Sequence, residues 1–185
     1  MTLRLRDCLA SAALLVAAWP FVAQALEYRQ LQLQASSITF SYKQMGVAMD
    51  GRFKKFSAQV SLDPAQLAKA QGRIDIDLAS IDTGSAEADQ EVVGKPWFNV
   101  AAYPKASFVL KSLQASGPGK YEALGSLSIK GQTRELRAPL TLTPQGQLSG
   151  SFLLRRGDFG IGEGMWAKFD VVANEITVNF KLQLQ

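Results

Sequence analysis

The chain has 185 residues and a formal net charge of +4, which is too small and too dispersed to indicate nucleic-acid binding. It contains no His, and its only cysteine is Cys8. The usual ligands for zinc, copper and haem are therefore missing from the rest of the chain, as are the Ser-His-Asp and Cys-His nucleophiles.

The first 25 residues have the pattern of a signal peptide that is cleaved on export. Arg4 and Arg6 precede an apolar run from Leu9 to Val22, and Ala23-Gln24-Ala25 fits a small-x-small cleavage site. Pro20 interrupts this run, which is also short for a membrane-spanning helix. We expect a mature chain of residues 26–185, whose length suits one domain.

From Leu26 onward, apolar and polar residues alternate with the period of half-buried strands. Ile38, Phe40 and Tyr42 share one face of the first clear strand, and Asp50-Gly51 is a hairpin signal that follows it. Residues 64–70 are predicted to form a short helix capped by Asp63, because Pro suits the first helical position.

One long stretch, residues 80–108, breaks the alternation. Ser85 can cap a short helix there, and Gly94 and Pro96 would end it after about two turns. An aromatic group follows, and a strand resumes around Lys105. A long excursion with its own helix is rarely mere linker, so we predict that it plugs or covers one end of a barrel. The aromatic residues are Trp97, Phe98 and Tyr103.

The alternation then returns and runs to the end of the chain. Turns are predicted at residues 117–119, 130–132 and 144–146, and the clearest strand runs from Glu175 to Leu184. About eight amphipathic strands at hairpin spacing indicate an antiparallel barrel or a sandwich, and periodicity alone does not separate the two.

Four blocks, in order along the mature chain, resemble the YceI-like proteins. They are MGVAMDGRFKKFSAQVSLDP (45–64), SIDTGSAEADQEVVGKPWFNVAAYPKASF (80–108), GSLSIKGQTRELRAPLTL (125–142) and RRGDFGIG (155–162). Each block alone is weak, but the four together are specific. One departure is Gln44, which stands where many members of that family have a His.

The resemblance implies an all-β fold: a lipocalin-like, extended antiparallel β-barrel of about eight strands with one or two short helices. It also implies a periplasmic, non-enzymatic protein that needs no cofactor and holds an isoprenoid lipid in an apolar interior. The ligand would be an isoprenoid quinone or a polyprenyl chain. Transient membrane contact and formation of a homodimer are left open.

The candidate ligand-binding residues are the large aromatic residues and one arginine. Arg156 falls on the same face of its strand as Phe152 and Leu154, so burial is expected. A buried Arg needs a partner, and an ion pair with Asp158 or Asp82 is as consistent with the pattern as a ligand contact. Lys43, Gln44 and Tyr103 are further candidate donors for a head group. The ligand-binding set is Phe40, Tyr42, Phe56, Trp97, Phe98, Phe108, Phe152, Arg156, Phe159 and Trp166.

Two other functions remain open from the sequence. A small barrel can be filled by its own side chains. The protein would then be an interaction module that assists a membrane redox or stress-response system, with an exposed apolar patch instead of a tunnel. An enzyme acting on a lipid would need two carboxylates that converge in a pocket, and the sequence offers no evident pair.

Overall fold

The computed structural model describes residues 27–185, so the predicted signal peptide and its cleavage site lie outside the described residues. The strands are β1 (Leu31–Gln44), β2 (Val47–Phe53), β3 (Phe56–Ser61), β4 (Gln71–Asp77), β5 (Ile81–Asp82), β6 (Lys105–Gly117), β7 (Lys120–Ile129), β8 (Gln132–Leu142), β9 (Gln147–Arg155) and β10 (Glu175–Leu184). The helices are α1 (Ala86–Val92) and the 3-10 turns η1 (Leu67–Lys69), η2 (Leu78–Ser80), η3 (Arg156–Phe159) and η4 (Gly164–Trp166).

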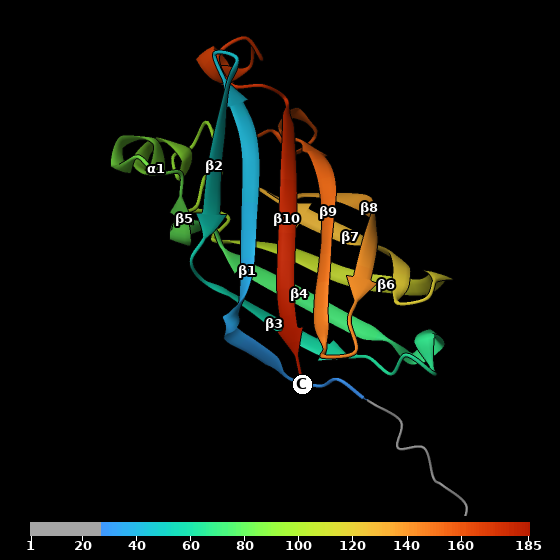
Figure 1. Cartoon of the computed structure of the whole chain (residues 1–185). Helices are drawn as coiled ribbons and strands as arrows, with labels where there is room; N and C mark the ends of the chain where they lie inside the picture. The colour runs from blue at the N-terminus through green and yellow to red at the C-terminus, as the bar shows by residue number, and fades with distance from the viewer. Residues whose placement is uncertain (1–26) are drawn as a thin grey trace, which may run out of the picture.

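These strands form one antiparallel sheet in the order β3-β4-β6-β7-β8-β9-β10-β1-β2-β5 (Figure 1). The two ends of this order are joined by the chain, because β3 continues β2 and β5 continues β4. Backbone hydrogen bonds bridge the two bends: Lys54 N–H donates to the Ser80 carbonyl and Asp77 N–H to the Lys55 carbonyl, both at 3.0 Å. If each bent pair is counted as one strand, the ten segments form eight, as the sequence predicted.

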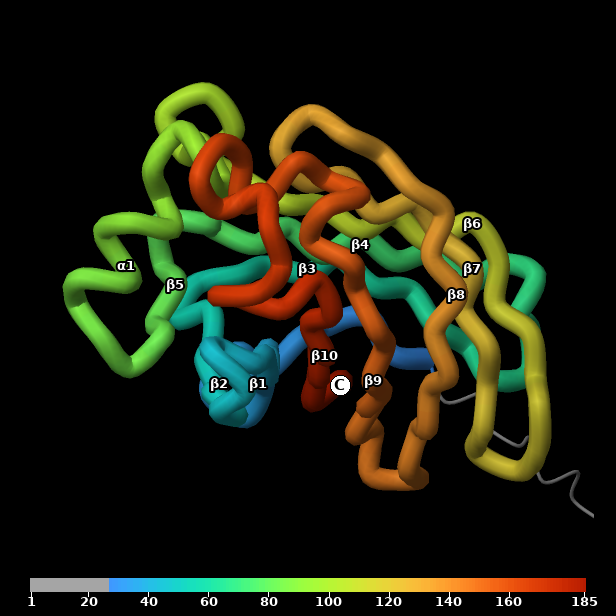
Figure 2. Tube along the Cα trace, turned by 90° about the horizontal axis from the view of Figure 1, so that it is seen from above, coloured from blue at the N-terminus to red at the C-terminus, as the bar shows by residue number. Residues whose placement is uncertain are grey.

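The wall of the barrel is incomplete between β8 and β9. These strands pair only next to their turn, from Leu140 opposite Gly150 to Leu142 opposite Leu148. By contrast, β9 pairs with β10 along its whole length, from Arg155 opposite Glu175 to Gln147 opposite Gln183. The view from above shows a curled sheet, with the segment between β9 and β10 lying over one end (Figure 2). The fold is therefore a curled, partly open antiparallel barrel.

Most predicted turns are confirmed, but two local predictions are wrong. Asp50 and Gly51 lie inside β2, and the hairpin turn is at Met45-Gly46. Gly51 is needed for space, since a Cβ there would overlap the Phe40 ring on the neighbouring strand. The predicted helix at residues 64–70 is reduced to the single 3-10 turn η1, and Asp63 instead accepts a hydrogen bond from the Ala65 N–H (2.8 Å).

Gly150 and Phe180 form a further pair of this kind, in which a phenylalanine ring covers a glycine on the adjacent strand. Gly150 lies opposite Phe180, and a Cβ at Gly150 would overlap that ring and the Pro139 carbonyl oxygen. At Gly72 the nearest atom, Leu110 Cβ, would be 3.4 Å away, which is an ordinary contact.

Gly150→Ala is therefore expected to lower the free energy of unfolding by about 1–3 kcal/mol, because backbone and ring must both shift. Gly72→Ala is the matched control and is expected to be neutral or stabilising by up to about 1 kcal/mol, since it restricts the unfolded chain. Urea denaturation of both variants tests this, and equal midpoints would contradict it.

The interior divides into two hydrophobic clusters stacked along the barrel. The upper cluster lies at the end that carries the Met45-Gly46 turn and the segment between β9 and β10, and it includes Leu78, Trp97 and Phe159. The lower cluster includes Tyr28 and Leu184 near the opposite end. Among residues 27–185, none of the helices has the length and apolar character needed to cross a bilayer.

Candidate functional site

A cavity of about 550 Å³ lies within the upper cluster. Its wall is mostly apolar and comes from β1, β2, β4, β6, β7, β9 and β10. Three of its lining residues, Gln44, Glu87 and Glu91, are exposed, so the cavity opens at the upper end between β1 and α1. This volume falls within the range of small-molecule sites, about 300–1,000 Å³.

A second, smaller cavity of about 130 Å³ lies within the lower cluster. Four side chains line both cavities: Ile76, Leu127, Phe152 and Val178. The two spaces are therefore consecutive along the barrel and separated only by these apolar groups. Together they form an elongated apolar interior, and the larger cavity opens at the upper end.

The predicted ligand-binding residues divide into those that line a cavity and two that do not. Phe56 packs against the lower cluster, and Phe159 is buried in the upper cluster, but neither faces a cavity. Of the additional candidate donors, Gln44 lines the larger cavity, whereas Lys43 and Tyr103 do not. The larger cavity is lined by Phe40, Tyr42, Trp97, Phe98, Phe152, Arg156 and Trp166, and the smaller by Phe108 and Phe152.

Arg156 is 1% exposed, and its partners differ from those predicted. Asp82 forms an ion pair with Arg52 (3.0 Å), and Asp158 makes no ion pair within the described part of the chain. The guanidinium instead donates seven hydrogen bonds to carbonyl oxygens of the segment between β9 and β10. These acceptors are Ile161 (2.7 Å), Gly162 (3.3 Å), Trp166 (2.8 Å), Lys168 (3.4 Å), Val172 (3.3 and 2.8 Å) and Ala173 (3.2 Å).

Through these hydrogen bonds, Arg156 holds the segment between β9 and β10 in place over the upper end of the barrel. All three guanidinium nitrogens donate to carbonyls, so no nitrogen of this group is left to be a ligand's main donor. Burial lowers the pKa of Arg156 from its very high ordinary value, which leaves it charged at neutral pH. Gly162 is required beside it, since its φ is +82° and a Cβ there would overlap the guanidinium.

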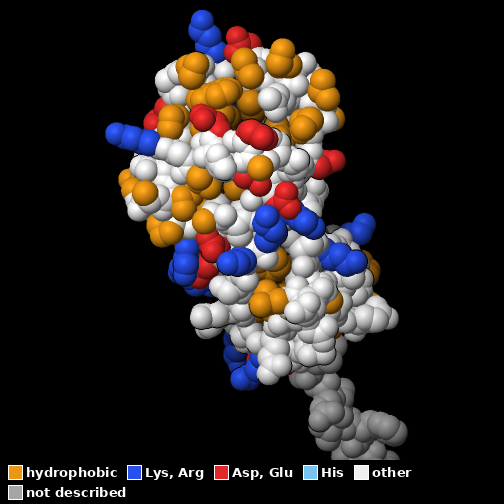
Figure 3. Space-filling view, turned by 90° about the vertical axis from the view of Figure 1, so that its left-hand side faces the viewer, with side chains coloured by type: hydrophobic (Ala, Val, Ile, Leu, Met, Phe, Trp, Pro, Cys, Tyr) orange, Lys and Arg blue, Asp and Glu red, His pale blue; other side chains and the backbone are white. Residues whose placement is uncertain are grey.

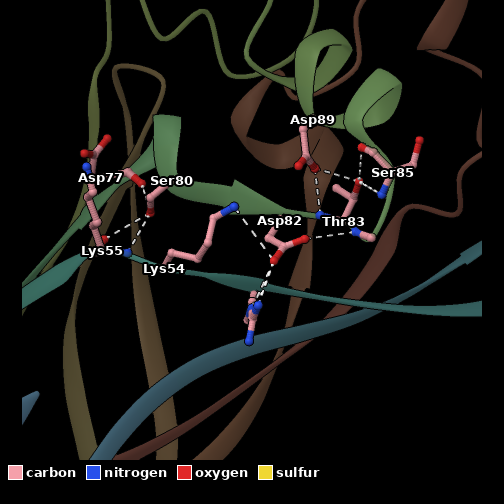
Figure 4. Close-up of polar contacts among 10 residues, drawn as sticks. Lys54, Lys55, Asp77, Ser80, Asp82, Thr83, Ser85 and Asp89 are labelled. Carbon is pink, nitrogen blue, oxygen red and sulfur yellow. Dashed lines mark hydrogen bonds and ion pairs between the residues drawn. The ribbon is translucent and has the colours of Figure 1, made fainter. Parts of the chain in front are cut away.

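Helix α1 lies at the opening of the larger cavity, which we call the mouth, and the turn that precedes the helix fixes its position (Figure 4). Asp89 accepts from both the backbone N–H and the hydroxyl of Thr83 (2.7 and 2.8 Å), and Ser85 Oγ accepts from the Ala88 N–H (3.4 Å). Gly84 has a φ of +83°, and its N–H donates to Asp82 (3.2 Å). The prediction of a Ser85-capped helix is confirmed.

The same helix brings two carboxylates to the mouth that sequence reasoning did not assign there. Glu87 and Glu91 both line the opening but are exposed. Hydrogen bonds from its own backbone N–H and from the Ser85 hydroxyl lower the pKa of Glu87, so it is ionised at neutral pH. Trp166 Nε1 donates to Glu91 (2.9 Å), which links η4 to α1. The i, i+4 spacing of the two glutamates, which places them on one face of the helix, was the sequence signal that could have indicated this.

The remaining polar groups of the wall are neutral. Burial, with a smaller contribution from the charge of Asp89, raises the pKa of Tyr42, so its hydroxyl keeps its proton. The indole N–H of Trp97 is buried and has no hydrogen-bond partner among the described residues. Within residues 27–185, no group of three or more His, Cys, Asp or Glu side chains is arranged to hold a metal ion.

Comparison with known proteins identifies the family, because residues 30–184 match the YceI-like domain. The chain belongs to the YceI-like family. Among YceI-like relatives, a UPF0312 protein of Vibrio cholerae is 29% identical over 153 residues, which covers 77% of this chain and 81% of the relative.

Solved structures share the YceI-like fold. The crystal structure of Burkholderia cenocepacia BcnA is similar with a TM-score of 0.80 and 36% identity, covering 83% of this chain and 98% of BcnA. A polyisoprenoid binding domain from Saccharophagus degradans has a TM-score of 0.63 at 17% identity, covering 84% of this chain and 95% of that domain. The predicted family and lipocalin-like fold are confirmed.

Proposed function

We propose that this protein is a non-catalytic carrier that holds an isoprenoid lipid in its barrel, and that it works in the periplasm. The observation that carries this proposal is the pair of consecutive apolar cavities, about 550 and 130 Å³. A buried chain gains about 0.8 kcal/mol per CH₂, so a long flexible lipid needs few directional contacts to bind tightly. The periplasmic location is supported by the predicted signal peptide.

The shape of the interior favours a chain over a compact ligand. Val178 and Phe152 lie between the two cavities and line both of them. Because both side chains are apolar, they present no polar barrier to a hydrocarbon chain. A polyprenyl tail would extend past them into the lower cluster. The likeness in fold to a polyisoprenoid binding domain supports this class of ligand.

The mouth favours a neutral head group, such as a quinone or an alcohol. Glu87 and Glu91 line the opening, and the one cationic lining residue, Arg156, has its nitrogens committed to carbonyls. A phosphorylated head would meet two carboxylates there, and like charges repel. We infer that a ligand oxygen or a water accepts from Trp97 Nε1, since an unpaired buried donor costs about 1–3 kcal/mol.

The alternative functions receive less support. An interaction module with a packed core does not account for the two cavities. Enzymatic use of Glu87 and Glu91 is not favoured by their surroundings, because both side chains are exposed at the opening and do not converge inside the cavity. Formation of a homodimer stays open, as it was from the sequence.

Tryptophan fluorescence tests the proposal directly. Of the three tryptophans, Trp19 lies in the predicted signal peptide, while Trp97 and Trp166 line the larger cavity. Titration with a short-chain ubiquinone is expected to quench this emission saturably at one ligand per protein, and a prenyl alcohol should compete about tenfold better than its phosphate. Linear, unsaturable quenching that no prenyl alcohol displaces would contradict the proposal.

A further inference from the structure

Five large apolar side chains stand exposed at the upper end of the barrel. They gather where the β1–β2 turn meets the segment between β9 and β10, and Met45 N–H donates to the Val171 carbonyl there (2.7 Å). The space-filling view shows hydrophobic side chains concentrated over the upper part of the molecule (Figure 3). This mouth patch consists of Met45 (76% exposed), Val47 (61%), Met165 (85%), Phe169 (47%) and Val171 (37%).

The turn that carries Met45 is not explained by local stability. Met45 and Gly46 both have positive φ, 50° and 81°, as in a type I′ hairpin turn. Asn or Asp is strongly favoured over Met at the first of these positions, because their short polar side chains tolerate the left-handed region. The chain instead holds a long apolar side chain in an unfavourable conformation with most of its surface in water.

Three residues of the patch are next in sequence to residues that line the larger cavity. Met45 follows Gln44, Met165 precedes Trp166 and Val171 precedes Val172, and each of these three neighbours lines the larger cavity. Phe169 lies against the Arg156 guanidinium, 4.8 Å from the centre of its ring. The exposed apolar side chains therefore border one side of the opening through which a lipid would pass.

Size and charge indicate the kind of partner. A stable protein interface uses about 20–30 residues a side, far more than this patch of protruding side chains supplies. Exposed Lys43 and Lys168 flank it without an ion pair among the described residues, and exposed Asp170 stands between Phe169 and Val171. Glu87 and Glu91 lie on the α1 side of the opening. The surroundings are thus mixed in charge, and apolar insertion would drive binding more than attraction to anionic lipid.

We propose that the mouth patch inserts into the interfacial layer of a lipid bilayer, so that the cavity opens toward the membrane from which an isoprenoid lipid is taken. The partner is the bilayer itself, and the inference rests on the proposed carrier function. It assigns a role to Met45 and Met165 that neither the barrel nor the cavity requires.

The test is co-sedimentation of the protein with phosphatidylcholine vesicles. The protein is purified after export, and its mass is measured to establish that the signal peptide has been removed. M45N/M165Q is expected to bind about tenfold more weakly than the unmodified protein. Its melting temperature should be equal or higher, because Asn-Gly is a preferred type I′ pair. The matched control L33Q/V109Q removes two exposed apolar side chains from β1 and β6 that belong neither to the β1–β2 turn nor to the segment between β9 and β10, and it should bind as the unmodified protein does.

Each outcome decides. Sedimentation that survives 0.5 M NaCl and is lost only in M45N/M165Q supports insertion. No sedimentation, equal loss in both double variants, or a dimer in gel filtration that M45N/M165Q abolishes would overturn it. Quinone titration without vesicles is the separate readout of the carrier function: M45N/M165Q should still bind, and a failure of the unmodified protein to bind would refute the carrier and leave the vesicle result to stand for itself.

Discussion

Replacing Arg156 with Met is expected to lower the free energy of unfolding by about 3–5 kcal/mol, a large effect that is typical of breaking a buried hydrogen-bond network. Met keeps much of the apolar stem but leaves six carbonyl oxygens without their donor. Each buried carbonyl left unpaired costs about 1–3 kcal/mol, although water entering the loosened segment will offset part of this. Urea denaturation followed by tryptophan fluorescence measures the loss.

The segment between β9 and β10 should also become a protease substrate in Arg156→Met, since Arg156 is its main tie to the barrel. Arg155→Met is the matched control, because Arg155 is exposed and its replacement should change stability by no more than about 0.5 kcal/mol. Arg156→Lys should fall between the two, as an ammonium keeps the charge but not the planar fork of donors. Equal stability of the Arg155 and Arg156 variants would show that the hydrogen bonds from Arg156 to the carbonyls contribute little to stability.

Val178→Phe is expected to change ligand binding and stability in opposite directions. Val178 lines both cavities, so a larger side chain there would fill the passage between them. If it displaces about three chain carbons at about 0.8 kcal/mol each, the loss is about 2.4 kcal/mol, or about 50-fold in Kd. The ligand-free protein should be as stable as before or more stable by about 0.5–2 kcal/mol, as for other cavity-filling substitutions.

A packed core makes the contrary prediction for stability. In that case the added ring would have no space, and Val178→Phe would destabilise the protein by about 1–3 kcal/mol. Val109→Phe provides the control, because Val109 is 40% exposed on the outside of β6 and the same substitution there should leave quinone binding unchanged. The pair of measurements, urea midpoint and quinone affinity, therefore separates a hollow barrel from a filled one.

Much of the fold could be predicted because its physical causes are local. Alternation with period two specifies half-buried strands such as β10, and Ser85 with the Gly94-Pro96 stop specifies α1. Asp50-Gly51 misled for a reason that is not local: the glycine leaves room for Phe40 on another strand, which no turn rule detects. Of the five candidate aromatic residues on strands, all but Phe56 line a cavity, since inward faces are shared along a strand.

The site was harder to predict because it depends on contacts between distant segments. Burial of Arg156 could be predicted from the face it shares with Phe152. Its carbonyl partners could not, because backbone acceptors have no sequence signature and a carboxylate is the usual expectation. Glu91 at the mouth likewise depends on Trp166, 75 positions away in the sequence.

Native mass spectrometry of the protein purified from its native source tests the central claim most directly. The carrier account predicts a one-to-one adduct whose mass, after solvent extraction, is that of an isoprenoid quinone or another neutral polyprenyl lipid. A clean protein mass that persists after incubation with quinones and polyprenols would contradict it.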